Sequence, residues 1–345
     1  MARWWIVLGF VCLTALPPTS RAESPPAPAE SVELGTVLVS PRRVPGLSVN
    51  ASEFPGNATV ITATDIERSG STSLPELLAR QEGLTLLDTN GFGLGADSSD
   101  NLRGIVNSSR TNALVLIDGV RQNRLTGDEV HWQSIPPDQV ERIEILRGGG
   151  SLIYGEGALA GVISITTKKG AEKRLETESG IEWGSFGQQR YVTSARGQAG
   201  PLTYGTSYTR RVLSGYREST NSRMTTITSH VGMDVLPTLR VEANVLHSED
   251  TSYFAGGITP EASQERRRQK GPFPTMSDDR TEQVSLETIW GGEAGFSAVA
   301  TAFWKFRESD SDSAGSRFAT ITPSRGLSLR GSHEQEVGSV RHTLI

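Results

Sequence analysis

The sequence is poor in cysteine and has no long apolar run, and each absence excludes a class of protein. Cys12 is the single cysteine among 345 residues, and it lies in a segment that we expect to be removed. Disulfide frameworks and thiolate metal sites are therefore excluded for the mature chain. No apolar run reaches the ~18 residues that a membrane-spanning helix needs. Neither sign of charge dominates, with 34 Lys and Arg against 39 Asp and Glu, so nucleic acid is not an expected partner.

The first 22 residues have the pattern of a secretory signal peptide. Arg3 precedes the uncharged run 4–16, which is followed by two prolines and a small-residue ending at Ala22. A buried helix is the alternative, but these flanks disfavour it. We therefore predict cleavage after Ala22 and export of the chain.

The rest of the chain changes composition twice. Residues 23–50 begin with a Pro/Ala-rich stretch that predicts an extended linker. Residues 51–170 have mixed α/β signals, with strands expected at 58–61, 114–117, 142–146 and 161–167. Helices are expected at 64–68, with Thr64 as the cap, and at 73–80, with Pro75 in the first turn.

After residue 170 the helical periods vanish and apolar residues alternate with polar ones. The alternation covers 202–209, 239–245, 283–290 and 296–307, and predicts strands with one apolar and one polar face. Tight connections at 197–201, 236–238 and 291–295 separate longer ones at 214–222, 248–280 and from 308 onward. Short turns at one rim and long loops at the other are typical of an outer-membrane β-barrel. Trp183, Trp290 and Trp304 near strand ends favour this interpretation, and a soluble β-sandwich is the alternative.

Apparent catalytic motifs do not have the required context. Residues 155–160 fit G-x-G-x-x-A, but a β-branched strand follows where a dinucleotide site needs a helix. His333 and Glu334 begin H-E-x-x-H, but Val337 replaces the second histidine, and there is no G-x-S-x-G elbow. The five histidines are scattered, and Asp310 and Asp312 lie in a Ser-rich stretch typical of a solvated loop. We therefore expect no enzyme activity, no cofactor and no metal site.

Several segments carry a specific family resemblance. Near the predicted mature N-terminus stands VELGTVLVS at 32–40. NLRGI at 101–105 and LVLIDGV at 114–120 follow, and then VERIEILRG at 140–148, SLIYG at 151–155 and GVI at 161–163. In order and spacing these motifs resemble the plug core of TonB-dependent outer-membrane receptors, and the first resembles their TonB box. Gly149 stands where the family often has proline, which is a small departure.

The resemblance implies a fold and a role. We expect a 51–170 α/β plug domain, called the plug below, followed by an antiparallel transmembrane β-barrel in the bacterial outer membrane, in contact with lipid and lipopolysaccharide. The family takes up scarce nutrients with energy delivered through the partner protein TonB, and the receptor makes or breaks no bond. Ferric siderophores are the expected substrate class, and cobalamin or another chelate is the alternative. A passive porin is disfavoured by the plug and the TonB box.

The resemblance also assigns residues. The TonB box covers about 34–40 and would pair with TonB by strand addition, through Thr36, Val37, Leu38, Val39 and Ser40. Plug structure is expected to depend on Arg103, Gly104, Asp118, Gly119, Arg147, Gly148, Tyr154 and Gly155. Two outward apices, at 90–100 and 121–133, would contact substrate through Phe92, Arg121, Asn123, Arg124, His131 and Trp132. In the family the arginines of the R-G motifs reach carboxylates in later barrel strands, which residues 171–345 do not supply. We therefore expect Arg103 and Arg147 to find plug-internal or backbone partners.

The barrel is expected to be incomplete. Residues 171–345 supply eight or nine strands, whereas plugged barrels close roughly 22. A plug of this length is too wide for an eight-stranded barrel, which holds only its own side chains. We therefore expect an open, curved sheet against the plug, with edge strands near 175 and 340. The sequence does not distinguish among three origins of such an incomplete barrel: a fragment, a truncated reading frame and a pseudogene product.

Overall fold

The computed structural model describes residues 57–88, 98–102, 113–124, 130–148, 154, 157–291, 296–313, 315–337 and 340–344. The predicted signal peptide, the linker and the TonB box lie outside the described residues.

The plug is built on a five-stranded mixed sheet in the order β1-β6-β7-β4-β5. Its strands are β1 (Asn57–Thr62), β4 (Ala113–Ile117), β5 (Val120–Arg121), β6 (Val140–Arg147) and β7 (Gly161–Thr167). The β4–β7 pair is parallel, and the other pairs are antiparallel. The four strands that the sequence predicts are confirmed. A separate hairpin of β2 (Leu84–Asp88) and β3 (Ser98–Leu102) is not predicted.

Two short helices follow β1, and one cap differs from the prediction. Helix α1 (Ala63–Ser69) begins after Thr62, whose side chain accepts a hydrogen bond from the Asp65 backbone N–H while Asp65 binds the Thr62 N–H in return. The predicted cap at Thr64 is wrong, because this reciprocal capping box satisfies two free N–H groups at once. Helix α2 (Leu74–Ala79) begins after Ser73 with Pro75 in its first turn, as predicted.

The plug core lies on both faces of the five-stranded sheet. On one face, side chains of α1 and α2 such as Ile66, Leu74 and Leu78 pack with alternate residues of the strands. A smaller cluster that includes Leu114, Leu146 and Val162 covers the other face. Because both faces are covered, strand β4, which lies between β7 and β5, is apolar and buried along its whole length.

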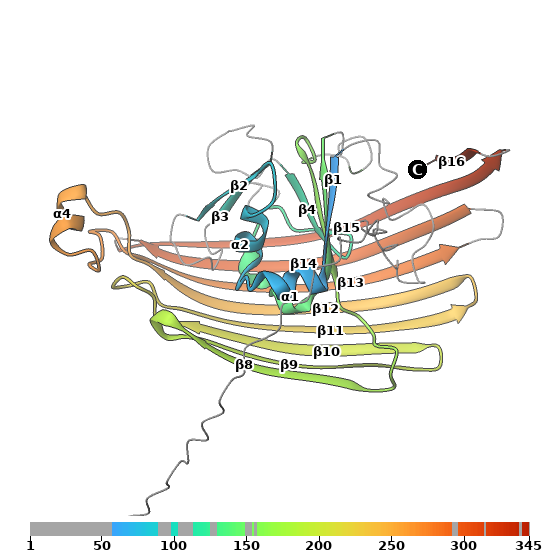
Figure 1. Cartoon of the computed structure of the whole chain (residues 1–345), viewed down its shortest axis with the longest axis horizontal. Coiled ribbons are helices and arrows are strands. Elements are labelled where there is room, and N and C mark those ends of the chain that lie inside the picture. Colours follow the sequence, from blue (N-terminus) through green and yellow to red (C-terminus); the bar gives the residue numbers. More distant parts are fainter. Residues whose placement is uncertain are drawn as a thin grey trace, which may run out of the picture. The chain divides into compact units, whose positions relative to one another are not determined.

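The second half of the chain is a single antiparallel sheet of nine strands in sequence order (Figure 1). The strands are β8 (Glu176–Gly184), β9 (Gln188–Ala199), β10 (Leu202–Leu213), β11 (Ser222–Leu236), β12 (Leu239–Phe254), β13 (Thr275–Gly291), β14 (Phe296–Ser313), β15 (Ser316–Val337) and β16 (Val340–Leu344). The strands β8 and β16 stand at its two ends. This open sheet with edges near 175 and 340 is the arrangement that the sequence predicts.

Two connections are shorter than predicted. The sequence predicts a loop at 248–280, but β12 and β13 pair as far as Phe254 and Thr275, and the short helix α4 (Pro260–Glu265) lies in the remaining segment. The prediction of a long loop from residue 308 onward is also wrong, because β14 and β15 pair up to Ser313 and Ser316. Backbone pairing satisfies N–H and C=O groups whatever the side chains are, so the Ser/Asp-rich ends of these strands still form a ladder.

The two faces of the nine-stranded sheet have the reverse of the usual polarity. Apolar side chains such as Val231, Leu286 and Leu329 are exposed, whereas Thr209, Ser248 and Thr301 on the opposite face are almost completely buried. In a water-soluble β-sandwich the apolar face would be the covered one. An apolar outer face with a polar inner face is instead what a strand in a lipid bilayer requires. Among the described residues, no helix has both the length and the hydropathy to cross a membrane.

Candidate functional site

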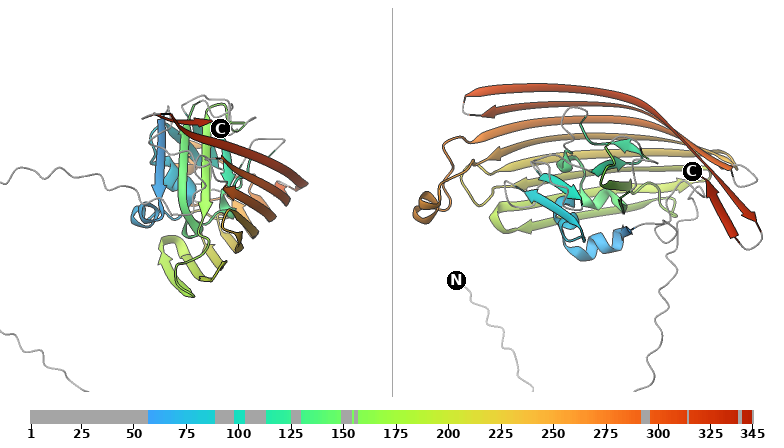
Figure 2. Two further views of the ribbon diagram at one scale, coloured as in Figure 1. Left: turned by 90° about the vertical axis from the view of Figure 1, so that its right-hand side faces the viewer. Right: turned by 90° about the horizontal axis from the view of Figure 1, so that it is seen from above.

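The plug lies against the polar face of the nine-stranded sheet, and the seam between them is the candidate functional site (Figure 2). Three plug segments contribute to it, at 117–124, 130–139 and 167–169. We call this seam the plug–sheet interface. Its contacts include hydrogen bonds and ion pairs, for which water can substitute, so it can separate and reform at lower cost than an apolar core.

A tight turn places Asp118 at one end of the interface. Asp118 and Gly119 join β4 to β5 with φ values of 46° and 78°, which is the left-handed conformation that an Asp-Gly hairpin turn uses. The Asp118 carboxylate accepts hydrogen bonds from Thr167 N at 3.1 Å and Thr167 Oγ1 at 2.6 Å. This fixes the end of β7 and therefore the start of the segment that leaves the plug.

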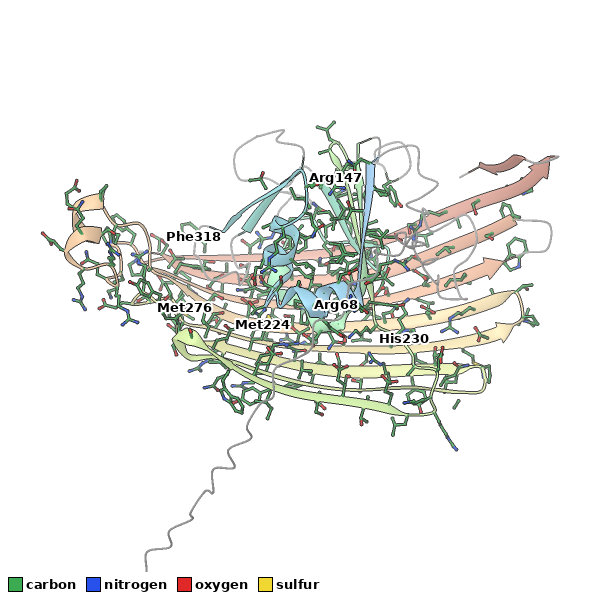
Figure 3. All side chains as sticks on the ribbon, viewed as in Figure 1. Arg68, Arg147, Met224, His230, Met276 and Phe318 are labelled. Atoms are coloured by element: carbon green, nitrogen blue, oxygen red, sulfur yellow. The ribbon has the colours of Figure 1, made fainter. Side chains whose placement is uncertain are left out.

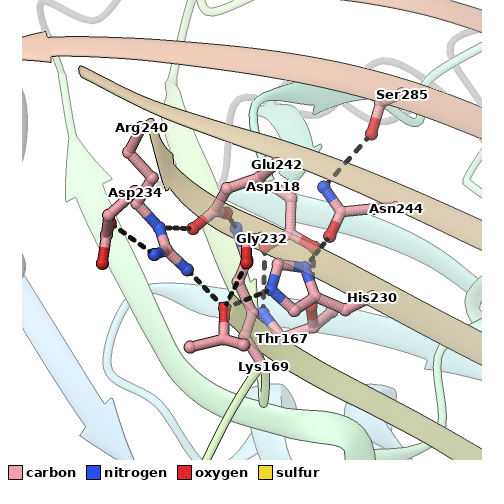
Figure 4. A network of polar contacts seen from close by, with 11 residues as sticks. Asp118, Thr167, Lys169, His230, Gly232, Asp234, Arg240, Glu242, Asn244 and Ser285 are labelled. Atoms are coloured by element: carbon pink, nitrogen blue, oxygen red, sulfur yellow. Dashed lines mark hydrogen bonds and ion pairs between the residues drawn. The ribbon is translucent and has the colours of Figure 1, made fainter. Parts of the chain in front are cut away.

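Lys169, two residues later, connects the plug to the sheet (Figure 4). Its ammonium group forms an ion pair with Glu242 of β12, whose side chain is almost fully buried. Arg240 also binds Glu242, with Nε 2.5 Å from Oε1, and it donates to Asp234 Oδ1 at 2.7 Å and Thr203 Oγ1 at 2.6 Å. One buried carboxylate is thus shared between a cation of the plug segment and a cation of the sheet.

Electrostatics favour the charged form of Lys169. Burial by itself lowers the pKa of Lys169, but the carboxylates of Asp118, Glu242 and Glu287 outweigh burial and raise the pKa above its usual value. A glycine allows the close approach, since a Cβ on Gly205 would lie 2.6 Å from the Lys169 carbonyl oxygen. A cavity of about 40 Å³ beside Lys169 is lined with polar groups that include Asn244 and His230.

A second set of contacts is centred on the 3-10 helix η2 (Pro137–Gln139). Asp138 accepts a hydrogen bond from Thr209 Oγ1 at 2.7 Å and lies 3.0 Å from Arg190 Nη2. Gln139 Oε1 accepts from Thr228 Oγ1 at 3.4 Å. These contacts reach β9, β10 and β11, so this plug segment bridges three strands of the sheet.

A third set involves the segments beside β5 and η1 (Trp132–Ser134). Gln122 Nε2 donates to Gln283 Oε1 at 3.0 Å, and Lys305 Nζ donates to Gln122 Oε1 at 2.7 Å. Gln133 Nε2 donates to Ser252 Oγ at 3.2 Å. Each uses a neutral amide, which can exchange for water at modest cost.

The structure places three of the predicted substrate residues in the interior. Asn123 is 6% exposed and binds the β4 backbone through Val115 N and Ala113 O. Trp132 is 1% exposed and belongs to the plug core, and His131 is 8% exposed and faces the sheet. The prediction that these three side chains form an outward apex is therefore wrong for this structure, because all three are buried inside the molecule.

The other predicted substrate residues divide into two groups. Arg121 and Arg124 are half-buried beside the interface. Phe92 lies outside the described residues, as does the tip of the second apex at 125–129. Substrate contact by these residues stays a prediction.

Among the predicted plug residues, Arg147 has the expected partners. Figure 3 labels Arg147 in the plug. Arg147 donates to the Glu82 carbonyl oxygen at 3.0 Å, to Asn57 Oδ1 at 2.9 Å and to Thr59 Oγ1 at 2.6 Å, and all three partners belong to the plug. Burial lowers its pKa from the usual value. The expectation of plug-internal partners is confirmed for Arg147.

The remaining predicted plug residues have mixed outcomes. Gly148 has φ 83° and ends β6 in a conformation that favours glycine. Tyr154 packs on the smaller apolar cluster, and burial raises the pKa of its hydroxyl. Arg103, Gly104 and Gly155 lie outside the described residues.

Sequence reasoning missed the charged residues that hold the interface together. These are Lys169 and Asp138 on the plug side, and Arg190, Arg240 and Glu242 on the sheet side. A signal was available, since the strand pattern puts Glu242 on the polar face of β12, where a charge needs a partner. The partners themselves could not be found, because they lie far away along the chain.

Comparisons with known proteins agree on one family. Residues 50–162 match the family model "TonB-dependent Receptor Plug Domain". Vitamin B12 transporters BtuB from strains of Vibrio cholerae serotype O1 are 36% identical over 144 residues, which is 42% of this chain and 22% of theirs.

Solved structures extend the similarity to the nine-stranded sheet. The unliganded ferric citrate transporter FecA matches with a TM-score of 0.71 at 18% identity, over 85% of this chain and 46% of that one. The alcaligin outer-membrane receptor FauA from Bordetella pertussis matches with a TM-score of 0.66 at 16% identity, over 84% and 46%. At such identities these matches show a shared fold. The chain spans about a fifth of the curated relatives and just under half of the solved structures.

Proposed function

We propose that this chain, whose residues 50–162 match the plug-domain model and whose nine-stranded sheet shares the fold of solved outer-membrane receptors, serves active uptake of a metal chelate across the outer membrane. The observation that carries the proposal is the polar plug–sheet interface. Uptake through a plugged sheet requires the plug to shift and return, and hydrogen bonds that water can replace make this reversible.

We propose TonB as the partner that moves the plug. Residues 36–40 are β-prone and follow a Pro-rich linker, so they suit pairing by strand addition. The predicted signal peptide would bring the chain to the envelope in which such a partner works. Lys169 and Asp138 are the contacts that a pull on the N-terminal segment would have to loosen.

For the substrate we propose a ferric siderophore. Two solved neighbours carry the names of a ferric citrate transporter and an alcaligin receptor, and their fold covers more than four fifths of this chain. Arg121 and Arg124 place cationic groups beside the second apex, which suits an anionic chelate.

Cobalamin is the second candidate, and a specific observation favours it. The curated relatives, which match by sequence at 36% identity, are named vitamin B12 transporters. Their match covers 144 residues, so it concerns less than half of this chain.

The test measures uptake in the native host with the gene at its own locus. We expect deletion of the gene to abolish uptake of one labelled chelate, either a ferric siderophore or cyanocobalamin, and deletion of TonB to abolish the same uptake. Passive diffusion of the chelate at equal rates in all three strains would contradict the proposal. Loss of cyanocobalamin uptake alone would replace the siderophore by the second candidate.

A further inference from the structure

Three side chains from distant parts of the sequence converge at the plug–sheet interface. His131 comes from the plug, just before η1, while Asp250 lies on β12 and Asp279 on the neighbouring strand β13. Each offers one ligand atom, and these atoms all lie within 4.8 Å of one another. Asp250 and Asp279 are directly opposite in the strand register, so both carboxylates lie on the polar face towards the plug.

The central carboxylate lacks normal hydrogen-bond donors. The side chain of Asp250 is 1% exposed, and its Oδ1 lies 2.9 Å from His131 Nε2. That contact is outside hydrogen-bond geometry, and in the described part of the chain neither oxygen of Asp250 accepts a normal hydrogen bond. The same holds for both ring nitrogens of His131. A buried carboxylate without donors is costly, so this arrangement calls for a cation.

Asp279 is already held in place by its neighbours. Arg307 Nη2 lies 2.9 Å from Asp279 Oδ1, and Ser277 Oγ donates to Oδ2 at 2.8 Å. Each carboxylate oxygen has two lone pairs, so Asp279 retains capacity for a further contact. These partners orient Asp279 in the way that outer contacts orient ligands at metal sites.

We propose that His131, Asp250 and Asp279 bind a divalent transition-metal ion that bridges the plug and the sheet. One imidazole nitrogen and two carboxylate oxygens suit Zn²⁺, Co²⁺ or Mn²⁺, whereas Ca²⁺ and Mg²⁺ prefer oxygen ligands alone. Two atoms that each lie ~2.1 Å from one ion are separated by roughly 3 to 4 Å, so small side-chain shifts bring the three into place. Solvent would complete the coordination.

The site would fasten the plug to the sheet. Its ligands come from both sides of the interface, so an ion bound there favours the docked plug and is released when the plug moves. Arg307 limits the affinity, because its positive charge lies next to Asp279 and repels a second cation. Removal of that charge should therefore strengthen metal binding, although it also removes an ion pair.

The experiment measures metal binding by the protein purified from its own locus in detergent and freed of metal with a chelator. We expect one equivalent of Co²⁺ to bind at micromolar concentration, with visible absorption typical of a low-coordinate nitrogen and oxygen site. His131→Gln and Asp250→Asn should weaken binding at least tenfold, and Arg307→Gln should strengthen it. His247→Gln is the matched control, because His247 also lies near two carboxylates, Glu249 and Glu282, but on the other face of the sheet.

Several outcomes would overturn the proposal. Absence of Co²⁺ and Zn²⁺ binding to the unmodified protein would show that this cluster does not bind a metal ion. Binding that is unchanged in His131→Gln, or equally weakened in His247→Gln, would place the ion elsewhere. Far-UV circular dichroism shows which variants are folded, and the Co²⁺ spectrum of the unmodified protein does not depend on any variant. The metal-binding results do not test the proposed TonB-dependent uptake, which is measured in a separate experiment.

Discussion

At the scale of the residue, the side chains that matter most here replace missing backbone or charge partners. Asn123 takes the place of a strand neighbour for β4, since its amide binds both Val115 N and Ala113 O. Arg147 likewise donates to the Glu82 backbone carbonyl oxygen. Such residues stabilise the plug through these internal hydrogen bonds.

We predict that Asn123→Ala destabilises the plug by about 1–3 kcal/mol, because it leaves a buried N–H and a buried C=O without partners. Urea unfolding of the protein in detergent, followed by Trp fluorescence, measures this change. Asn221→Ala, at an exposed position, is the control and should stay within about 0.5 kcal/mol of the unmodified protein. Equal effects of the two substitutions would show that the Asn123 amide has no structural role.

A second prediction concerns acid stability. Hydrogen bonds from the Thr62 side chain and backbone lower the pKa of Asp65 from its usual 3.8. Because the folded pKa is below the unfolded one, the stabilisation is present above pH ~4 and is lost as the pH falls through the folded pKa. The stability difference between the unmodified protein and Asp65→Asn should therefore shrink below pH 4. A difference that grows towards low pH would contradict the capping box.

At the scale of the element, two kinds of segment have opposite requirements. A plug strand such as β4 must be apolar on both faces because both are covered, whereas the nine strands of the sheet alternate. The predicted TonB box belongs to neither kind, since its partner would be another protein.

We predict that the double change Val37→Pro, Val39→Pro abolishes chelate uptake and leaves surface binding intact. Proline removes the N–H that strand pairing needs. Ala29→Pro, in the Pro-rich stretch before the box, is the matched control and should transport normally. Uptake that survives the double change would show that residues 36–40 are not the TonB box.

At the scale of the whole molecule, polar contacts join the plug to the nine-stranded sheet. The plug has an ordinary apolar core, and the nine-stranded sheet has an apolar outer face. Between them lie ion pairs such as Lys169–Glu242 and Asp138–Arg190.

We predict that Lys169→Met loosens the plug and lowers its stability by about 1–3 kcal/mol, as expected for loss of a charged hydrogen bond. Arg240 still binds Glu242, so the carboxylate is not left alone. Hydrogen exchange of β7 amides measures the loosening, and Lys173→Met at an exposed position is the control. Unchanged exchange in Lys169→Met would show that this ion pair does not hold the plug.

A further prediction follows from the ends of the sheet. Residues 1–345 expressed alone should not insert stably into a bilayer, because β8 and β16 present backbone N–H and C=O groups that hydrocarbon cannot satisfy. Electrophoresis of unheated and heated membrane fractions tests this. A folded, heat-modifiable species that restores TonB-dependent uptake would show that the sheet closes in another way.

The sequence by itself determined four strands of the plug sheet and the alternation of the nine-stranded sheet. These follow from local rules, since periodicity and turn chemistry act over a few residues. The observed cap of α1 at Thr62 differs from the predicted cap at Thr64 by two residues, about half a helical turn. The family resemblance could also be recognised from the sequence, because it rests on short contiguous motifs.

The tertiary structure alone decided which residues meet across the interface. The sequence predicts that Asn123 and Trp132 lie at an exposed apex. In the folded protein both are buried, because Asn123 binds the backbone of β4 and Trp132 packs in the plug core. His131 meets Asp250 and Asp279, and Lys169 meets Glu242, at separations that no sequence motif spans. Local patterns fix what a segment forms, whereas burial and the pairing of distant charges depend on where the whole chain places it.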